Sequence, residues 1–456
     1  MRKRMKSKAF SFGIAALLTT VAFSPVQAES IQEALGLAYS NNPSLNAARA
    51  QLRGVDENVP QALSGWRPTV SATASIGSVR SRTDNFDSYR NNSSLSLTLT
   101  QALFRGFRTV NSTKQAEAVV LAQRESLSAT EQDVLLAAAQ AYVDVIRDTA
   151  LVSLSRSDTN FLVEQVRAAR DRFDVGEGTR TDVSQADARR SEAQASLNAS
   201  LANLNASRAI YRQIVGIEAN NLTASTSVGI LVPETLDAAI AASDKLQPLI
   251  RQAQHMVDAG IYAVKTAEGA LLPTVSVEGS LTQNWQPSAN VDRSTSAAIY
   301  GRVSIPIYQG GAEYSAVRQV KQELGQTRLQ LDVTRDRVRA NVISAWGNYQ
   351  AAEASISAAQ AAVEAQQLAL DGVLEEQRVG QRTTLDVLDA QRELVNQRVN
   401  LVTAQRNRIV SGYQLLAAVG KLDVDNLNLN VRRYDPKANY AKVRDKWFGL
   451  RTPDGR

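Results

Sequence analysis

The chain contains two pairs of short segments in which apolar and polar residues alternate. In the first pair, apolar residues alternate with Ser and Thr over residues 68–80 and 93–105. In the second pair, Val, Leu, Ile and Tyr alternate with Ser, Glu and Arg over residues 273–284 and 295–308. A period of two is typical of strands with one apolar and one polar face. The pattern therefore predicts four strands, two in each half of the chain.

The stretches that join the strands of each pair, residues 82–92 and 284–293, are polar and rich in Asn, Asp and Ser. This composition is typical of long exposed loops, and we expect loops there. The alternation alone would favour ordinary half-buried hairpins. However, each strand is long enough to cross a bilayer obliquely, and the rest of the chain offers no sheet to pack against. An apolar face without a protein partner indicates a barrel with lipid outside and water inside.

Four strands cannot close a barrel, and lipid does not tolerate open sheet edges. The chain is therefore expected to assemble as a ring. Three copies would supply twelve strands, which we take as the smallest number that leaves room for a water-filled lumen. After the N-terminal segment, no stretch of the sequence reaches the roughly 18–20 consecutive apolar residues of a spanning helix, so any crossing must use strands.

Long segments almost free of proline and glycine separate the strands. Residues 108–173, as one helix, would be about 100 Å long, much longer than a helix of an ordinary globular domain. Heptad spacing, as in Val387, Leu394 and Leu401, indicates packing along a coiled seam. The predicted helices cover residues of about 30–65, 108–173, 180–215, 235–270, 312–377 and 384–419.

The two halves of the chain align with each other. Pro68-Thr69-Val70-Ser71 recurs as Pro273-Thr274-Val275-Ser276, and the glycine breaks after the long helices recur at an offset of 204. Such a duplication indicates one supersecondary unit used twice, a strand hairpin followed by long helices. The predicted units are repeat 1 (29–220), a linker (221–233), repeat 2 (234–420) and a basic tail (421–456).

The first residues predict an export signal. A basic start is followed by an apolar stretch from Ala9 to Phe23 and by small residues up to Ala28, which is the pattern of a cleaved signal peptide over residues 1–28. Without this peptide the chain carries 46 basic and 45 acidic residues. A nearly neutral mature chain gives no support to nucleic-acid binding.

The inventory of reactive residues is small. The chain has no cysteine and one histidine, His255. A disulfide framework, a thiol nucleophile and a Cys/His zinc site are therefore excluded, and no serine lies in a G-x-S-x-G context. We expect no catalytic residues, no metal site, no cofactor and no enzyme activity.

One glycine break separates the long helices in each half. Gly176 and Gly380 fit the left-handed position that ends a helix, and Thr179 and Thr383 fit the N-cap of the next helix. Asp182 and Asp386 follow each threonine by three residues, as capping-box acids do. The sequence therefore predicts two helical hairpins per chain, at the end far from the barrel.

Several motifs give the chain a resemblance to a known family. The motifs are Ala38–Leu45, the Pro68-Thr69-Val70 start of the first strand, Leu103–Gly106 after the second, and above all Val379–Gln391. Together with the duplication, these residues make the chain similar to the TolC-like outer-membrane efflux proteins over about Ile31 to Leu422.

The resemblance implies an α+β membrane protein of the outer membrane. It implies a homotrimer whose twelve-stranded β-barrel lies in the lipid and continues as a helical tunnel in the periplasm. It also implies partners, a periplasmic membrane-fusion adaptor and an inner-membrane transporter of the RND or ABC type, in a tripartite efflux pump or a type I secretion system. The cargo stays open, since drugs, bile salts, metals and secreted proteins share such ducts.

The hairpin tips are the candidate functional residues. In the family this end is the periplasmic mouth, where adaptors dock and acids narrow the pore. Asp386 and Asp389 lie three residues apart and would face the same way on a helix, so a trimer would place six carboxylates around the axis. We expect such a ring to select cations and to raise the pKa of its members by mutual repulsion. Arg382 is expected to close the mouth by pairing with Asp182 of an adjacent hairpin.

Alternatives stay open at several points. Capping alone explains Asp386 and Asp182, whereas Asp389 faces Gln185 in the aligned repeat. A trimeric coiled-coil stalk or adhesin with a small barrel anchor is the alternative function, and a periplasmic enzyme is a third. The tail is expected in the periplasm, around the waist of the tunnel. The residues expected to meet the adaptor are Val175, Gly176, Thr179, Val379, Gly380 and Thr383.

Overall fold

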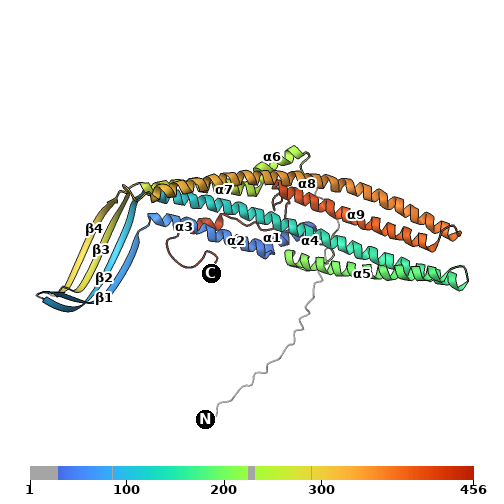
Figure 1. Cartoon of the computed structure of the whole chain (residues 1–456), viewed down its shortest axis with the longest axis horizontal. Coiled ribbons are helices and arrows are strands. Elements are labelled where there is room, and N and C mark those ends of the chain that lie inside the picture. The colour runs from blue at the N-terminus through green and yellow to red at the C-terminus, as the bar shows by residue number, and fades with distance from the viewer. Residues whose placement is uncertain (1–28, 85, 224–231, 289, 456) are drawn as a thin grey trace, which may run out of the picture.

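The computed structural model is an elongated molecule with a sheet at one end and long helices that extend away from it (Figure 1). It describes residues 29–455 except 85, 224–231 and 289. The expected signal peptide (1–28) and most of the expected linker (221–233) lie outside the described residues.

The sheet has four antiparallel strands in the order β1-β2-β3-β4. Its central pair, β2 with β3, joins the two repeats side by side. The bounds are β1 (Thr69–Thr83), β2 (Phe86–Arg105), β3 (Thr274–Ser288) and β4 (Val291–Ser304).

The register places apolar residues on one face of the sheet and polar residues on the other. Leu97 lies opposite Leu281, which lies opposite Ala297. On the other face, Ser96 and Thr282 share a hydrogen bond of 3.1 Å. The apolar face stays uncovered within the single chain, since Ile76 is 88% and Ile299 81% exposed. A sheet that leaves its apolar side chains in the open requires an apolar surrounding.

The long loops predicted at 82–92 and 284–293 are wrong. The strands continue almost to the turn, because polar side chains pair across them where the apolar alternation has ended. Arg80 binds Asp87 at 2.8 Å, and the Thr295 hydroxyl donates to Gln283 at 2.6 Å. At the other end, β4 stops at Ser304 rather than at residue 308, since Pro306 has no N–H for the ladder.

Four long helices form two hairpins beyond the sheet. Helices α4 (Arg108–Asp174) and α8 (Ala312–Arg378) have 67 residues each, and α5 (Arg180–Val215) and α9 (Thr384–Val419) have 36 each. The equal lengths follow from the constant offset between the repeats. In Figure 1, α4 runs with α5, and α8 runs with α9, to the end opposite the sheet.

The single helices predicted at 30–65 and 235–270 are wrong, because each is broken at a proline. Pro43 and Pro248 start new helices, since proline fits the first helical turn but cannot continue a preceding helix. Asn42 caps the first of these breaks by accepting the Ser44 N–H at 2.9 Å. The bounds are α1 (Ile31–Asn41), α2 (Pro43–Asp56), α3 (Asn58–Leu63), η1 (Ser64–Trp66), α6 (Leu236–Leu246), α7 (Pro248–Glu268) and η2 (Gly269–Leu271).

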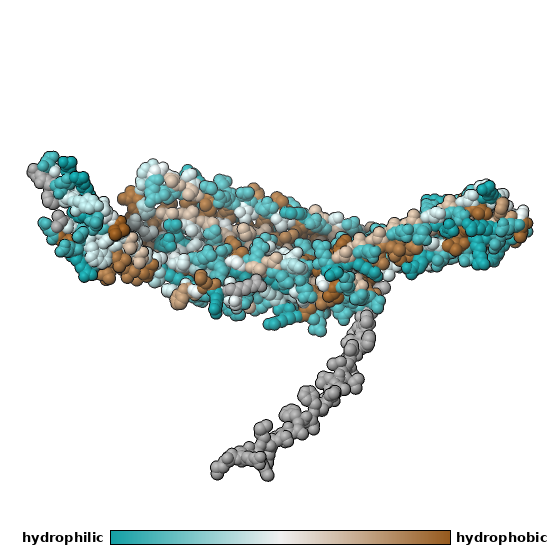
Figure 2. All heavy atoms as spheres, turned by 90° about the horizontal axis from the view of Figure 1, so that it is seen from below, coloured by the Kyte–Doolittle hydropathy of each residue, from teal (hydrophilic) through white to brown (hydrophobic). Residues whose placement is uncertain are grey.

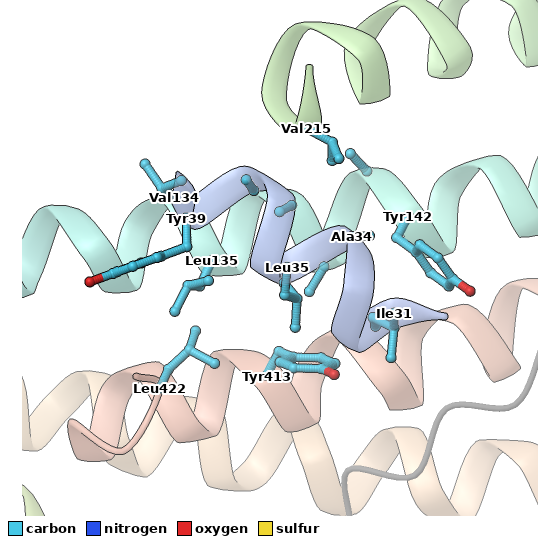
Figure 3. Close-up of a cluster of buried hydrophobic side chains, with 14 of the residues drawn as sticks. Ile31, Ala34, Leu35, Tyr39, Val134, Leu135, Tyr142, Val215, Tyr413 and Leu422 are labelled. Atoms are coloured by element: carbon cyan, nitrogen blue, oxygen red, sulfur yellow. The ribbon is translucent and has the colours of Figure 1, made fainter. Parts of the chain in front are cut away.

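The main core lies at the waist, where α1 crosses α4 (Figure 3). Leu35 and Ile31 of α1 point towards Tyr413 of α9, and Leu135 of α4 lies on the other side of Leu35. The C-terminal tail adds Leu422 and further apolar residues to this core. The tail therefore starts in the core at the waist and continues towards the sheet, with its short helix α10 (Ala438–Val443) packed against α2.

The two longest helices differ in burial although they hold equivalent places in the repeats. Helix α4 buries 21 of its residues and α8 buries 7. Much of α8 faces outwards, with apolar side chains such as Leu329 and Leu368 exposed. Within the described part of the chain, no helix is both long and apolar enough to span a membrane.

Candidate functional site at the helical hairpin tips

Both hairpin tips turn through a left-handed glycine. Gly176 has φ +82° and Gly380 has φ +78°, values that side-chain-bearing residues rarely adopt. After α4, the Glu177 N–H donates to the Arg172 carbonyl oxygen at 2.8 Å, and after α8 the Gln381 N–H donates to the Glu376 carbonyl oxygen at 2.9 Å. These bonds satisfy the last carbonyls of each helix and fix the direction in which the chain leaves it.

A capping box then starts the return helix at each tip. The Asp182 carboxylate accepts the Thr179 hydroxyl at 2.6 Å and its N–H at 3.0 Å. The Asp386 carboxylate accepts the Thr383 N–H and hydroxyl, both at 2.8 Å. In both boxes the threonine hydroxyl also accepts the N–H of the aspartate.

These hydrogen bonds lower the pKa of both aspartates below the ordinary value. The Thr179 hydroxyl is the main cause for Asp182, and the Thr383 N–H is the main cause for Asp386. The expected rise in the pKa of Asp386 belongs to a ring of carboxylates from three chains and stays a prediction, since within the single chain this carboxylate faces its cap donors.

The turn itself exposes apolar side chains. Val175 and Val379, which precede the two glycines, are each 71% exposed. A Cβ added at either glycine would meet nothing within 4 Å. Each of the two tips therefore exposes one apolar side chain next to polar capping residues.

The two hairpins are joined near their tips by an ion pair that the sequence analysis missed. Arg189 Nη2 of α5 lies 3.0 Å from Asp389 Oδ1 of α9. The same guanidinium binds Glu192 at 3.1 Å, and Asp389 remains about half exposed. The alignment of the two repeats marks Arg189 as a position where they differ in charge, since it aligns with Glu393.

Other contacts between the hairpins surround this pair. Gln391 Nε2 of α9 donates to Asp158 of α4 at 2.8 Å, and Leu388 packs against Leu162 and Val166. A cavity of about 220 Å³ lies between α4, α5 and α9, with Arg189 in its wall. Closer to the tips, the Arg172 guanidinium of α4 also donates to Gln377 of α8 at 3.4 Å, so several polar and apolar contacts join the two hairpins around the cavity.

The predicted pair of Arg382 with Asp182 is not formed between the hairpins of one chain, and for these hairpins the prediction is wrong. Arg382 Nε binds Glu376 Oε2 of its own hairpin at 2.7 Å, while Asp182 is occupied by its capping threonine. Glu376 is close because it lies on the last turn of α8, six residues before Arg382. Among the described residues, no group of three or more His, Cys, Asp or Glu side chains is arranged to hold a metal ion.

Comparison with known proteins gives consistent matches over nearly the whole chain. The family model described as outer membrane efflux protein matches residues 34–216 and 241–421, one segment in each repeat. Outer membrane efflux protein BepC of Brucella suis is 44% identical over 429 residues, which are 94% of this chain and 93% of the relative. Outer membrane protein TolC of Escherichia coli is 27% identical over 415 residues, covering 88% and 84%.

Solved structures share the same fold. The Campylobacter jejuni CmeC outer membrane channel superimposes with a TM-score of 0.78 at 16% identity, over 97% of this chain and 98% of that chain. At this identity the likeness concerns the fold alone. The sheet and the paired helical hairpins therefore match a channel architecture from end to end.

Proposed function

The chain belongs to the outer membrane efflux protein family, and we propose that it is the passive exit duct of a tripartite efflux pump or a type I secretion system. It is an outer-membrane protein and not an enzyme. The observation that carries the proposal is the four-stranded sheet, which leaves one apolar face uncovered and continues directly into two long helical hairpins.

A homotrimer completes the structure. A sheet of four strands has two open edges, β1 and β4, whose backbone groups need partners in lipid. Three chains joined edge to edge would give a twelve-stranded barrel. The exposed side of α8 supports the same assembly, because a neighbouring chain would cover it as α7 covers α4 within the chain.

The hairpin tips form the periplasmic mouth in this proposal. The exposed Val175 and Val379 with their glycines and capping threonines dock the tip of a periplasmic membrane-fusion adaptor. An inner-membrane transporter of the RND or ABC type supplies the energy. BepC is named an outer membrane efflux protein, which favours efflux over secretion as the role of this chain.

The charged residues of the tips form the constriction in the same proposal. Asp386 and Asp389 lie three residues apart at the start of α9, and Asp182 starts α5. In a trimer the Arg382 guanidinium faces two acids, Glu376 of its own hairpin and Asp182 of the neighbouring chain. Exchange between these partners would open and close the mouth.

The alternative, an exported trimeric stalk or adhesin, is not favoured, because strands occur in both halves of the chain and the family match covers both repeats. Single-channel recording separates the two functions. Purified trimers inserted in planar bilayers are expected to give stepwise, cation-selective conductance. Trimers that fractionate with the outer membrane and insert in lipid but never conduct would reject the duct and favour the stalk.

A further inference from the structure

The C-terminal tail runs from the waist back towards the sheet. It leaves α9 at Gly420 and packs along α1 and α2, where the Tyr434 N–H donates to the Tyr39 hydroxyl at 3.0 Å and Asn439 donates to Asp56 at 2.8 Å. Beyond α10 it reaches Arg67, whose guanidinium donates to the Lys446 carbonyl oxygen at 2.8 Å. Figure 1 shows this last segment as a loop beneath α3.

The tail changes character at this point. Up to Val443 its apolar side chains are mostly buried, whereas the three that follow are open. Trp447 is 61% exposed, Phe448 89%, and Leu450 fully exposed. Trp447 has one organised contact, with the Arg67 guanidinium 5.0 Å from its ring centre. An apolar group of this size at a chain end requires a covering partner.

The contact residue Arg67 fixes where this group lies. It directly precedes Pro68 and β1, so Trp447 sits beside the point where the chain enters the sheet. Other exposed aromatic residues mark the same level, namely Trp66 before β1, Phe107 after β2 and Tyr308 after β4. Figure 2 shows hydrophobic residues gathered where the sheet meets the helical body.

We propose that residues 446–451 of the tail lie on the periplasmic leaflet of the outer membrane, with Trp447, Phe448 and Leu450 inserted at the boundary between headgroups and acyl chains. Aromatic residues are enriched at this level of transmembrane barrels, because their rings are apolar and their edges are polar. The tail would thus extend the aromatic girdle that the strand ends begin. This inference rests on the proposed placement of the sheet in the outer membrane.

The charges of the segment fit a phospholipid surface. Between residues 442 and 455 the tail has four basic residues, Lys442, Arg444, Lys446 and Arg451, and two acidic ones. Basic side chains beside inserted aromatic residues bind lipid phosphates. Continuity with the lipid-facing sheet distinguishes this occupant from a second protein, since a bilayer around the strands necessarily ends at the level of Trp66 and Trp447.

Spin labels test the placement directly. The chain has no cysteine, so Phe448→Cys gives a unique labelling site. Two matched sites serve as controls in the full-length trimer, reconstituted in phospholipid vesicles. They are Ile299→Cys on the apolar face of the sheet and Lys437→Cys on an exposed part of the same tail. Collision rates of the label with oxygen, which concentrates in lipid, and with a water-soluble nickel chelate report the surroundings.

The label at 448 is expected to collide severalfold more with oxygen, relative to nickel, than the label at 437. A nickel-accessible label at 448 would place the segment in water, and a label protected from both reagents would place it under another protein; either result overturns the inference. The control at 299 separates the two proposals. If that site lies in lipid and 448 does not, only the tail assignment fails, whereas a water-exposed label at 299 rejects the duct itself.

Discussion

Arg189 on α5 and Asp389 on α9 form a 3.0 Å ion pair that connects the two hairpins of one chain. The pair is 200 residues apart in sequence and involves one of the carboxylates assigned to the pore constriction. Because Arg189 partly neutralises Asp389, the charge at the proposed mouth would depend on whether the two hairpins stay together. In the proposed duct, the same contact would link the selectivity of the mouth to its closure.

Removal of Arg189 is predicted to make the mouth more cation-selective and more open. Arg189→Ala leaves Asp389 unpaired and removes one of the contacts between the two hairpins, so we expect a higher resting conductance and a higher cation-to-anion permeability ratio in planar bilayers. Asp389→Ala is expected to open the mouth while lowering that ratio. Arg170→Ala is the matched control, since it breaks a pair of the same length with Asp187 inside one hairpin. Equal effects of the two arginine variants would contradict the role of the connection between hairpins.

Arg382→Ala is predicted to raise the single-channel conductance severalfold, because in the proposed trimer the guanidinium would face acids of two hairpins. Glu376→Gln removes only its partner in the same chain, which lies at 2.7 Å. We expect that variant to leave the conductance close to the wild-type value. If Glu376→Gln opened the channel as much as Arg382→Ala, the intrachain pair would account for the closure and no contact between chains would be needed.

Loss of a helix cap is predicted to loosen the tip alone. Thr383→Ala removes the hydroxyl that accepts the Asp386 N–H at 3.2 Å, a change that typically costs about 1 kcal/mol. Amide hydrogen exchange at the start of α9 should accelerate about fivefold.

Because the pKa of Asp386 is lowered, its cap persists above the ordinary aspartate pKa and is lost only as pH falls through the lowered value. Exchange at this tip should therefore be equally slow at pH 7 and pH 5, apart from the intrinsic rate.

Glu131 is predicted to make docking of the tail pH-dependent. Burial raises the pKa of Glu131 from 4.5 to about 7, although its side chain accepts the N–H of Val424 at 3.3 Å. The folded chain therefore binds the proton more tightly, and docking weakens as pH rises from about 4.5 to about 7, by at most about 3 kcal/mol. Proteolysis of the tail should accelerate over this range.

Glu131→Gln should remove that dependence, since the neutral amide still accepts the Val424 N–H. Glu164→Gln, an exposed change on the same helix, is the control and should leave it in place. A tail that stays pH-dependent in Glu131→Gln would assign the effect to other groups.

Substitution by alanine is predicted to destabilise the protein to different extents at two left-handed glycines. Gly176 (φ +82°) and Gly420 (φ +84°) both have a left-handed backbone. A residue with a side chain in this conformation typically costs about 1–2 kcal/mol of stability. Only at Gly420 would the added Cβ also lie 2.8 Å from the Leu246 carbonyl group. Gly420→Ala should therefore lower the temperature at which the trimer dissociates by clearly more than Gly176→Ala. Equal shifts would mean that α6 moves away without cost.

Local chemistry made the ends of the long helices predictable from sequence. Glycine followed by a capping threonine has one structural solution, so the starts of α5 and α9 lie at the residues that the pattern indicated. Pro43 and Pro248, inside the segments 30–65 and 235–270, carry equally clear information, since each starts a new helix. Hydropathy alternation located the apolar part of each strand and missed its polar extension, which cross-strand pairs such as Arg80 with Asp87 support.

The candidate site was predictable only within each hairpin. The capping role of Asp182 and Asp386 follows from residues three apart in sequence. The partner of Asp389 lies 200 residues away on a helix whose register against α9 is set by packing, so no local pattern encodes it. Arg382 is an exception within its hairpin, since Glu376 lies only six residues before it. The left-handed turn at Gly380 brings the two side chains to 2.7 Å, a contact that helical spacing does not predict.

The uneven burial of α4 and α8 has a consequence for how the duct is made in the cell. In the proposed trimer a free chain leaves part of its packing incomplete, because apolar side chains of α8 such as Leu329 and Leu368 stay exposed. The last step of folding is then bimolecular, and its yield rises with the concentration of newly exported chains. Co-expression of wild-type chains with a defective variant would produce mixed rings, so a single faulty copy would impair ducts built mainly from sound ones.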